Sequence, residues 1–315
     1  MDIYSSVLGY LFALPVLKDW PAARVLVEKA ARLEPRDWRL PLLGCEAVGG
    51  KPGQAIPAMA ALACVQTGII LIDDLLDEDP RGEYRLIGQA QTANFAASLF
   101  SFGQAAIIQS QSQMQEKLGA MDTLSCMAST VAFGQYLDSQ SPQTEDAYWQ
   151  VVETKSASFF AAALQLGAWF GGAPKTMVGN VGQFGSLYGV MIQIYDDLND
   201  SLDEPVSPDW IQKRSPLPIL FAELVEHPDH ARFQELRHDI SRPGALREAQ
   251  NLLIHCGAVS YCVDQLLQRH DAAKKVLRDL PPACQKTLEP LLEDLVAPIK
   301  KLLENATPTS GNKKE

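Results

Sequence analysis

Two short acidic segments are the part of this sequence best suited to chemistry. Both have the spacing Asp-Asp-x-x-Asp, and their members are Asp73, Asp74, Asp77, Asp196, Asp197 and Asp200. On a helix, positions i and i+4 share a face, so the first and last aspartates of each run repel one another. Oxygen ligands without His or Cys suit Mg²⁺, which completes its shell with water and phosphate oxygens. Two such runs facing each other across a cavity would hold Mg²⁺ around a diphosphate and favour its departure as a leaving group.

The segments that must position these aspartates have the periodicity of helices. Apolar residues recur at three- and four-residue spacing in the ranges Ala22–Leu33, Ala55–Leu76, Leu86–Ile108, Tyr148–Phe170 and Ala258–Leu277. Proline and glycine separate these segments, and alternating strand patterns are hard to find. The segments around Ala55–Leu76 and Val181–Ile194 have few polar residues on any face, which is typical of helices at the centre of a bundle. We therefore expect one all-α helical domain over residues 1–306, with a disordered tail over 307–315.

Composition excludes several classes of function. The 315 residues are 47% apolar and 21% charged, with a formal net charge of −11, which indicates a globular protein and opposes binding to nucleic acid or anionic lipid. No stretch reaches the roughly 18 uninterrupted apolar residues of a membrane span, so we expect a chain that does not span a membrane. The six cysteines form no CxxC pair and lie in apolar surroundings. We expect buried thiols in a reducing compartment and a cytoplasmic location.

The two acidic runs and the motifs around them resemble the trans-polyprenyl diphosphate synthase family, which includes farnesyl and geranylgeranyl diphosphate synthases. The other matching segments are Leu40-Pro41-Leu42-Leu43, Gly134-Gln135-Tyr136-Leu137-Asp138, Glu153-Thr154-Lys155, Leu166-Gly167, Gly171-Gly172 and Gly257-Ala258. The resemblance implies the all-α isoprenoid-synthase bundle around a central cavity, usually a homodimer. It also implies that the six aspartates bind three Mg²⁺ ions together with the diphosphate of an allylic prenyl substrate.

The resemblance further assigns residues that would contact that diphosphate. Lys155 matches the family's lysine at the allylic diphosphate, and Gln193 matches the glutamine just before the second motif. Arg81 is the surviving member of an arginine pair that follows the first motif. Either Lys213 or Arg214 takes the place of a lysine in a later segment, here Gln212 to Pro218.

The sequence departs from the family where chain-elongating members bind isopentenyl diphosphate. Asp37 and Trp38 stand where a Lys-Arg pair is expected, and Gln66 replaces a histidine seven residues before the first motif. Pro80-Arg81-Gly82 shortens the double arginine. Each lost cation removes a charge-assisted phosphate contact, worth about 1.5–3 kcal/mol. The basic residues that could compensate from nearby positions are Arg36, Arg39 and Lys51.

Three functions fit these departures. The favoured one is terpene-synthase chemistry, in which the cation formed from an allylic diphosphate is quenched internally or by water. The second is a prenyltransferase that uses isopentenyl diphosphate or another acceptor, such as a peptide or aromatic group. The third is a non-catalytic partner subunit of an active synthase. Gly68 and Ile69, which precede the first motif where the family lines its cavity floor, favour a prenyl chain of C15 to C20.

Overall fold

The computed structural model describes residues 2–306, and side chains as far as residue 298. Within that range the regular elements are all helical, which confirms the all-α prediction. Their bounds are α1 Ile3–Phe12, α2 Pro21–Ala31, α3 Leu40–Ala47, α4 Pro52–Leu76, α5 Tyr84–Ile87, α6 Gln89–Ile108, α7 Met114–Asp138, α8 Glu145–Val152, α9 Ser158–Phe170, α10 Lys175–Leu202, α11 Pro208–Gln212, α12 Leu217–Leu224, α13 His230–His238, α14 Ala245–His255, α15 Ala258–Arg278 and α16 Pro282–Ala306. Two 3₁₀ turns, η1 (Leu17–Asp19) and η2 (Arg36–Arg39), and one π-helical turn, η3 (Glu153–Ala157), join them. The tail expected over 307–315 lies outside the described residues.

Two of the expected helices are interrupted. The range Leu86–Ile108 is divided at Gly88, whose φ of 83° ends α5 and precedes α6. The range Tyr148–Phe170 stays helical throughout, but η3 inserts one π-helical turn between α8 and α9. Such turns shift the direction of the side chains that follow and are frequent at functional sites.

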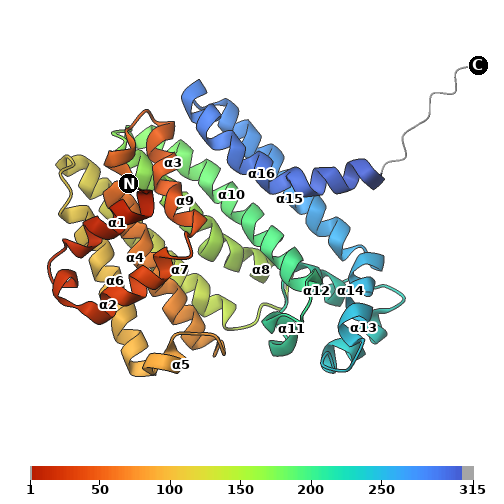
Figure 1. Ribbon diagram of the computed structural model, residues 1–315. Coiled ribbons are helices and arrows are strands. Elements are labelled where there is room, and N and C mark those ends of the chain that lie inside the picture. Colours follow the sequence, from red (N-terminus) through yellow and green to blue (C-terminus); the bar gives the residue numbers. More distant parts are fainter. Residues whose placement is uncertain (1, 307–315) are drawn as a thin grey trace, which may run out of the picture.

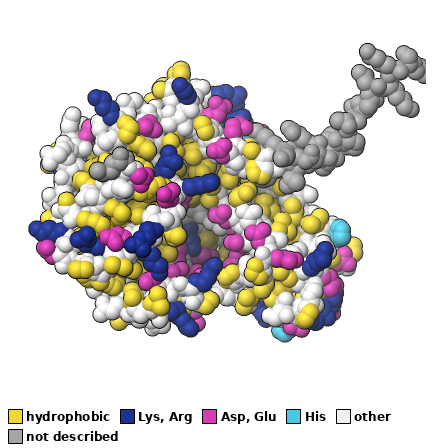
Figure 2. Space-filling view, in the orientation of Figure 1, with side chains coloured by type: hydrophobic (Ala, Val, Ile, Leu, Met, Phe, Trp, Pro, Cys, Tyr) yellow, Lys and Arg dark blue, Asp and Glu magenta, His cyan; other side chains and the backbone are white. Residues whose placement is uncertain are grey.

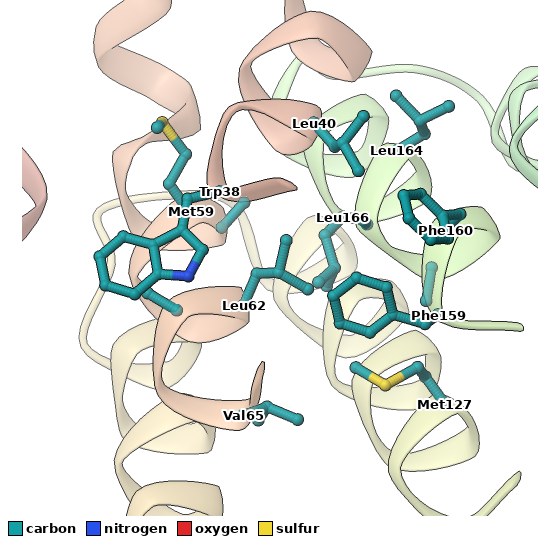
Figure 3. Close-up of a cluster of buried hydrophobic side chains, with 14 of the residues drawn as sticks. Trp38, Leu40, Met59, Leu62, Val65, Met127, Phe159, Phe160, Leu164 and Leu166 are labelled. Atoms are coloured by element: carbon teal, nitrogen blue, oxygen red, sulfur yellow. The ribbon is translucent and has the colours of Figure 1, made fainter. Parts of the chain in front are cut away.

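Helices α4 and α10 lie in the middle of the bundle, as their apolar sequences predict (Figure 1). Helix α4 is long and apolar enough to cross a membrane by composition, but 67% of its most apolar stretch is buried inside the protein. It is therefore the core helix of a bundle. Helix α9 packs against α3, α7 and α10, and Figure 3 shows Leu62 of α4 facing Leu166 and Phe159 of α9 across this core.

A smaller hydrophobic cluster lies under α11 to α14, next to the C-terminal end of α10. Trp210 and Phe233 are fully buried there, with their rings 6.1 Å apart in an edge-to-face arrangement. The Trp210 indole donates a hydrogen bond to the Ser201 carbonyl of α10 at 3.2 Å. This cluster fixes the segment that follows the second aspartate run.

The crossing of α3 and α9 brings two backbones into direct contact. A Cβ atom on Gly167 would lie 1.9 Å from the Pro41 carbonyl oxygen, and one on Gly44 would lie 2.1 Å from the Leu164 carbonyl oxygen. Neither neighbour is a flexible side chain, so the two helices would have to separate. The close crossing lets α9 reach the core beside α4.

We predict that Gly167→Ala destabilises the protein by about 3 kcal/mol or more, because overpacking here displaces backbone. Gly179→Ala in α10 is the matched control, since a Cβ there meets nothing within 4 Å and helix propensity favours Ala. Urea denaturation of both variants checks this. A Gly167→Ala midpoint equal to that of Gly179→Ala would contradict the proposed crossing.

Candidate active site

The two aspartate runs lie at the C-terminal ends of the two central helices. Asp73 and Asp74 are in the last turn of α4, and Asp77 caps it, donating its backbone N–H to the Asp73 carbonyl at 2.8 Å. The second run lies in the last turns of α10. Carboxylates at a helix C-terminus face the negative end of the helix dipole, which adds to their mutual repulsion. Figure 2 shows a hollow on one face of the molecule, with acidic and basic side chains around it.

Lys155 connects the first aspartate run to α7. Its Nζ lies 2.8 Å from Asp138 Oδ2 and 3.7 Å from Asp73 Oδ2. Lys155 belongs to the π-helical turn, which directs it toward these carboxylates. Burial acts to lower the pKa of Lys155, but the charges of Asp138 and Asp73 outweigh it and the net pKa is raised. The lysine is therefore a permanent cation beside the aspartates, as its predicted role requires.

The structure distinguishes the two alternatives at positions 213 and 214. An Arg214 guanidinium nitrogen lies 2.7 Å from Asp77 Oδ1, and the other lies 3.9 Å from Asp209 Oδ1. Lys213 has a left-handed backbone, with φ of 58°, and its Nζ lies 3.4 Å from His238 Nδ1 on α13. Arg214 therefore faces the aspartates, and the alternative prediction of Lys213 at the diphosphate is not supported by this geometry.

Asp197 differs from the other five aspartates because its buried carboxylate accepts hydrogen bonds from three separate helices. Only 5% of it is exposed, and it accepts hydrogen bonds from the Tyr148 hydroxyl at 2.7 Å, the Leu217 N–H at 2.8 Å and Gln193 Nε2 at 2.8 Å. Gln193 also accepts a hydrogen bond from Ser156 Oγ of η3. In this structure Asp197 and Gln193 link α8, η3, α10 and α12. Both residues therefore hold the elements around the site in position.

Arg81, predicted as a diphosphate ligand, forms a local ion pair instead. Its guanidinium donates two hydrogen bonds to the carboxylate of Asp79, at 3.1 and 2.9 Å, and the side chain is mostly exposed. Its charge still lowers the pKa of Asp200 and of Asp74, although burial raises both overall. Arg81 thus lies near both runs without pairing with either.

The carboxylates of the site carry negative charge that the protein only partly neutralises. Burial raises the pKa of Asp73 to about 6, with Asp77 adding repulsion and Lys155 opposing it. Burial, followed by the charge of Asp200, raises the pKa of Asp196 to about 6. A bound cation would relieve this repulsion.

The donor set fits Mg²⁺ that is shared with a substrate. All the candidate ligands are carboxylates, the ligand type that Mg²⁺ prefers. Within the described residues, no three Asp, Glu, His or Cys side chains come close enough to ligate a single ion between them. Mg²⁺ bound by one or two carboxylates typically takes its remaining ligands from water and phosphate. The site therefore suits a metal–diphosphate complex better than a metal held by protein alone.

Two further carboxylates belong to the site but were absent from the predicted ligands. Asp138 pairs with Lys155, and it closes a segment that the resemblance had already marked. Asp209 of α11 faces Arg214, and burial raises its pKa to about 6. Tyr148 also escaped prediction, because nothing in its local sequence connects it with Asp197, which lies 49 residues away.

Two of the departures from the family pattern contact one another. Gln66 Nε2 donates a hydrogen bond to Asp37 Oδ2 at 2.8 Å, joining α4 to η2. The Trp38 side chain is buried beside α4, near Met59 (Figure 3). Lys51 is the N-cap of α4, at the end of the helix opposite to the aspartates. At a rise of 1.5 Å per residue it lies about 22 Å from Gln66 along the helix axis. It therefore cannot replace the missing cations.

Comparisons with known proteins agree with the fold and the motifs. A family model described as polyprenyl synthetase matches residues 39–242. The chain is 28% identical over 274 residues to a short chain isoprenyl diphosphate synthase of Methanothermobacter thermautotrophicus, covering 82% of this chain and 83% of that protein. It is 27% identical over 296 residues to a geranylgeranyl diphosphate synthase of Methanosarcina mazei, covering 87% and 89%.

Solved structures share the fold. The geranylgeranyl pyrophosphate synthetase of Pyrococcus horikoshii Ot3 superposes with a TM-score of 0.81 at 23% identity, over 93% of this chain and 95% of that one. The relatives named here are prenyl diphosphate synthases, so the comparisons support the prenyltransferase alternative. They do not support the preference for terpene-synthase chemistry.

We predict that Asp196→Ala and Asp197→Ala fail in different ways. Asp196→Ala should reduce Mg²⁺-dependent diphosphate release by about 100-fold without lowering the melting temperature, because it relieves repulsion. Asp197→Ala should destabilise the protein by about 3 kcal/mol or more, because it leaves buried donors unpaired. Calorimetry and a diphosphate assay on both variants, with the exposed Asp122→Ala as control, test this. Equal melting temperatures would contradict the structural role of Asp197.

We also predict that Arg214→Gln weakens pyrophosphate binding in Mg²⁺ at least 10-fold, because it removes a charge-assisted contact. Lys213→Gln should change it less than twofold, since Lys213 faces His238. Titration calorimetry with pyrophosphate compares the pair. The reverse order would show that Lys213 is the diphosphate ligand.

Proposed function

The chain belongs to the polyprenyl synthetase family, and from this premise we propose that it is a Mg²⁺-dependent prenyltransferase acting on an allylic prenyl diphosphate. The observation that carries the proposal is the pair of aspartate runs with desolvated carboxylates, the first of which lies beside the cations Lys155 and Arg214. A diphosphate with its metal ions needs both kinds of ligand. The names of the relatives support the same class of substrate.

The residues of this chain would share the work of ionising the substrate. Lys155 and Arg214 would donate hydrogen bonds to the diphosphate, exchanging their carboxylate partners for its oxygens. Mg²⁺, when held by the aspartates with free oxygens, would neutralise the departing diphosphate. Asp197 and Gln193 would keep α8, α10 and α12 in register around it.

The carbocation that remains would face an apolar, aromatic interior. Phe159, Phe160 and Tyr188 pack edge to face in this core, with ring centroids 5.4 and 5.5 Å apart along the row. Ring faces attract cations, and a dry cavity keeps water away from the reactive carbon. A dry, aromatic interior of this kind would favour capture of the carbocation by a bound acceptor.

Product analysis tests this function. The protein would be incubated with C10, C15 or C20 allylic diphosphate in Mg²⁺ or EDTA, with or without an acceptor, and the products identified by mass spectrometry. We expect diphosphate release in Mg²⁺ but not in EDTA. When an acceptor is present, we expect a prenylated acceptor as the product. Hydrocarbons or alcohols as the main products would instead indicate terpene-synthase chemistry, and no turnover would indicate a non-catalytic subunit.

The proposed chain length of C15 to C20 depends on a residue that the sequence did not single out. Gly68 leaves space on α4, but a Cβ there would lie 3.1 Å from the Phe100 ring of α6. Phe100 therefore fills the space that a larger residue at position 68 would occupy. Chain length should follow the pair of residues and not Gly68 alone.

We predict that Phe100→Ala shifts the preferred allylic substrate or product toward longer chains, because it vacates the volume beside Gly68. Ile108→Ala, on an exposed position of the same helix, should leave the preference unchanged. Competition between C10, C15 and C20 diphosphates measures this. An unaltered chain-length distribution in Phe100→Ala would exclude Phe100 from the cavity floor.

We also propose that the protein is a homodimer through α7. Large apolar side chains are exposed along one face of this helix, namely Met114, Leu118, Phe133 and Tyr136. An exposed apolar face of this kind marks an interaction surface.

The acidic charge and the free cysteines fit a reducing, cytoplasmic location. Contrary to the expectation of buried thiols, however, Cys126 of α7 is exposed and Cys256 is half-buried.

We predict that Leu118→Glu converts the dimer into a monomer, because it places a charge in the apolar contact. Leu224→Glu, which is also exposed but lies on α12, is the control and should remain dimeric. Light scattering coupled to size exclusion gives the mass of each. A monomeric wild-type protein would rule out the dimer.

A further inference from the structure

A hydrogen-bonded Asp–Gln pair lies beside the candidate active site, where the resemblance leads one to expect cations. Gln66 Nε2 of α4 donates to Asp37 Oδ2 of η2 at 2.8 Å, across 29 residues of sequence. Two departures from the family pattern are thus one interaction, in which each side chain provides the other's partner. The pair is held together by this hydrogen bond, and its remaining side-chain oxygens are hydrogen-bond acceptors.

The pair faces the same space as the aspartate runs. Gln66 precedes Asp73 by seven residues, nearly two full turns, so both lie on one face of α4, about 10 Å apart along its axis. The charge of Asp37 also reaches α10. It contributes, after burial, to the raised pKa of Tyr188 and, after burial and the neighbouring aspartates, to that of Asp196. The pair therefore borders the space between the two central helices.

The charge around the pair disfavours a phosphorylated acceptor. An acceptor diphosphate would place its negative charge against Asp37 and near Asp196. Among the basic residues that could compensate, Arg36 acts on Tyr188 as Asp37 does, but its side chain is exposed. Arg39 acts instead on Tyr4, on the N-terminal side of η2. One exposed arginine does not replace the lost Lys, Arg and His positions.

The pair also has acceptor oxygens to spare. Gln66 Oε1 is buried and has no hydrogen-bond partner. Among the described residues, Asp37 is hydrogen-bonded through Oδ2 alone, which leaves Oδ1 available. Buried acceptors without partners cost free energy, and a ligand that donates hydrogen bonds recovers it. Burial raises the pKa of Tyr188 to about 12, so its hydroxyl stays neutral and adds no negative charge.

We propose that Asp37 and Gln66 select a phosphate-free acceptor with a nucleophilic N–H or O–H group, of the chemical class of an indole or a phenol. This inference rests on the proposed prenyl transfer. The bond between the allylic carbon and the diphosphate oxygen breaks, and its electron pair leaves with the diphosphate. The nitrogen or oxygen of the acceptor forms a new bond to that carbon, its N–H or O–H bond breaks, and that proton passes to the Asp37 carboxylate, while Gln66 holds the carboxylate in place.

Binding of isopentenyl diphosphate tests the selection without depending on turnover. Calorimetry would compare the affinity of isopentenyl diphosphate for the wild type and for Asp37→Lys/Gln66→His. EDTA is present in order to prevent Mg²⁺-dependent binding at the aspartate runs. We expect the double variant to bind at least 10-fold more tightly, and Gln66→His alone, should the double variant not fold, at least threefold. The proposal would be overturned if the wild type bound isopentenyl diphosphate with an affinity within threefold of that of the double variant. If only Gln66→His folds, an affinity of the wild type within 1.5-fold of that variant would overturn it.

Turnover tests the acceptor and the role of Asp37. The wild type would receive farnesyl diphosphate, Mg²⁺ and one of three acceptors, namely isopentenyl diphosphate, indole or p-cresol. We expect prenylated indole or cresol to exceed the elongated diphosphate by at least 10-fold. An elongated diphosphate as the main product, or farnesol and hydrocarbons with every acceptor, would overturn the proposal.

Asp37→Asn separates a proton acceptor from a structural residue, because the amide oxygen can still accept from Gln66. We expect transfer to indole or cresol to fall at least 10-fold relative to diphosphate release, with Asp122→Asn as the control. An unchanged ratio of transfer to release would overturn the role of Asp37. Absence of diphosphate release in any mixture would refute the proposed function, and the binding experiment in EDTA would still decide the acceptor inference.

Discussion

Repulsion among desolvated carboxylates is the constraint on which this structure depends. Two apolar helices, α4 and α10, end in aspartate runs, and burial raises the pKa of Asp73 and Asp196 to about 6. Charged groups in such surroundings are costly unless cations neutralise them. The bundle must hold the runs in place against this cost, and a cationic ligand removes it. Structure and proposed chemistry are therefore two aspects of one charge problem.

The surrounding elements meet this constraint in different ways. Lys155, presented by a π-helical turn, and Arg214, which follows α11, neutralise part of the first run. The carboxylate of Asp197 accepts three hydrogen bonds from the protein and so links the helices around it. On the acceptor side, Gln66 of α4 and Asp37 of η2 add acceptor oxygens where cations would serve a diphosphate. The two sides of the site therefore suit different partners.

Much of this could be predicted from the sequence because it depends on local patterns. Helical periodicity gave the all-α fold, and the Asp-Asp-x-x-Asp spacing identified both runs. The structure was needed wherever the answer depends on contacts between distant segments. Tyr148 pairs with Asp197, Phe100 fills the space beside Gly68, and Gln66 pairs with Asp37, and none of these partners is close in sequence. The choice between Lys213 and Arg214 depended on the left-handed backbone at Lys213.

The preference for terpene-synthase chemistry arose from counting lost cations at single positions. The comparisons favour prenyl transfer, and the structure shows that two of the changed positions form a hydrogen-bonded pair. A changed acceptor site is therefore compatible with an intact ionisation site. The sequence could not show this, because it does not reveal that Asp37 and Gln66, 29 residues apart, are hydrogen-bonded to each other.

The most direct test of the central claim is calorimetric titration of pyrophosphate into the protein, once in Mg²⁺ and once in EDTA. We predict binding in Mg²⁺ that is at least 100-fold tighter than in EDTA, because the carboxylates repel the anion until metal ions neutralise them. Equal binding in both buffers would show that basic residues alone hold the diphosphate. It would contradict the assignment of the aspartate runs as a metal–diphosphate site.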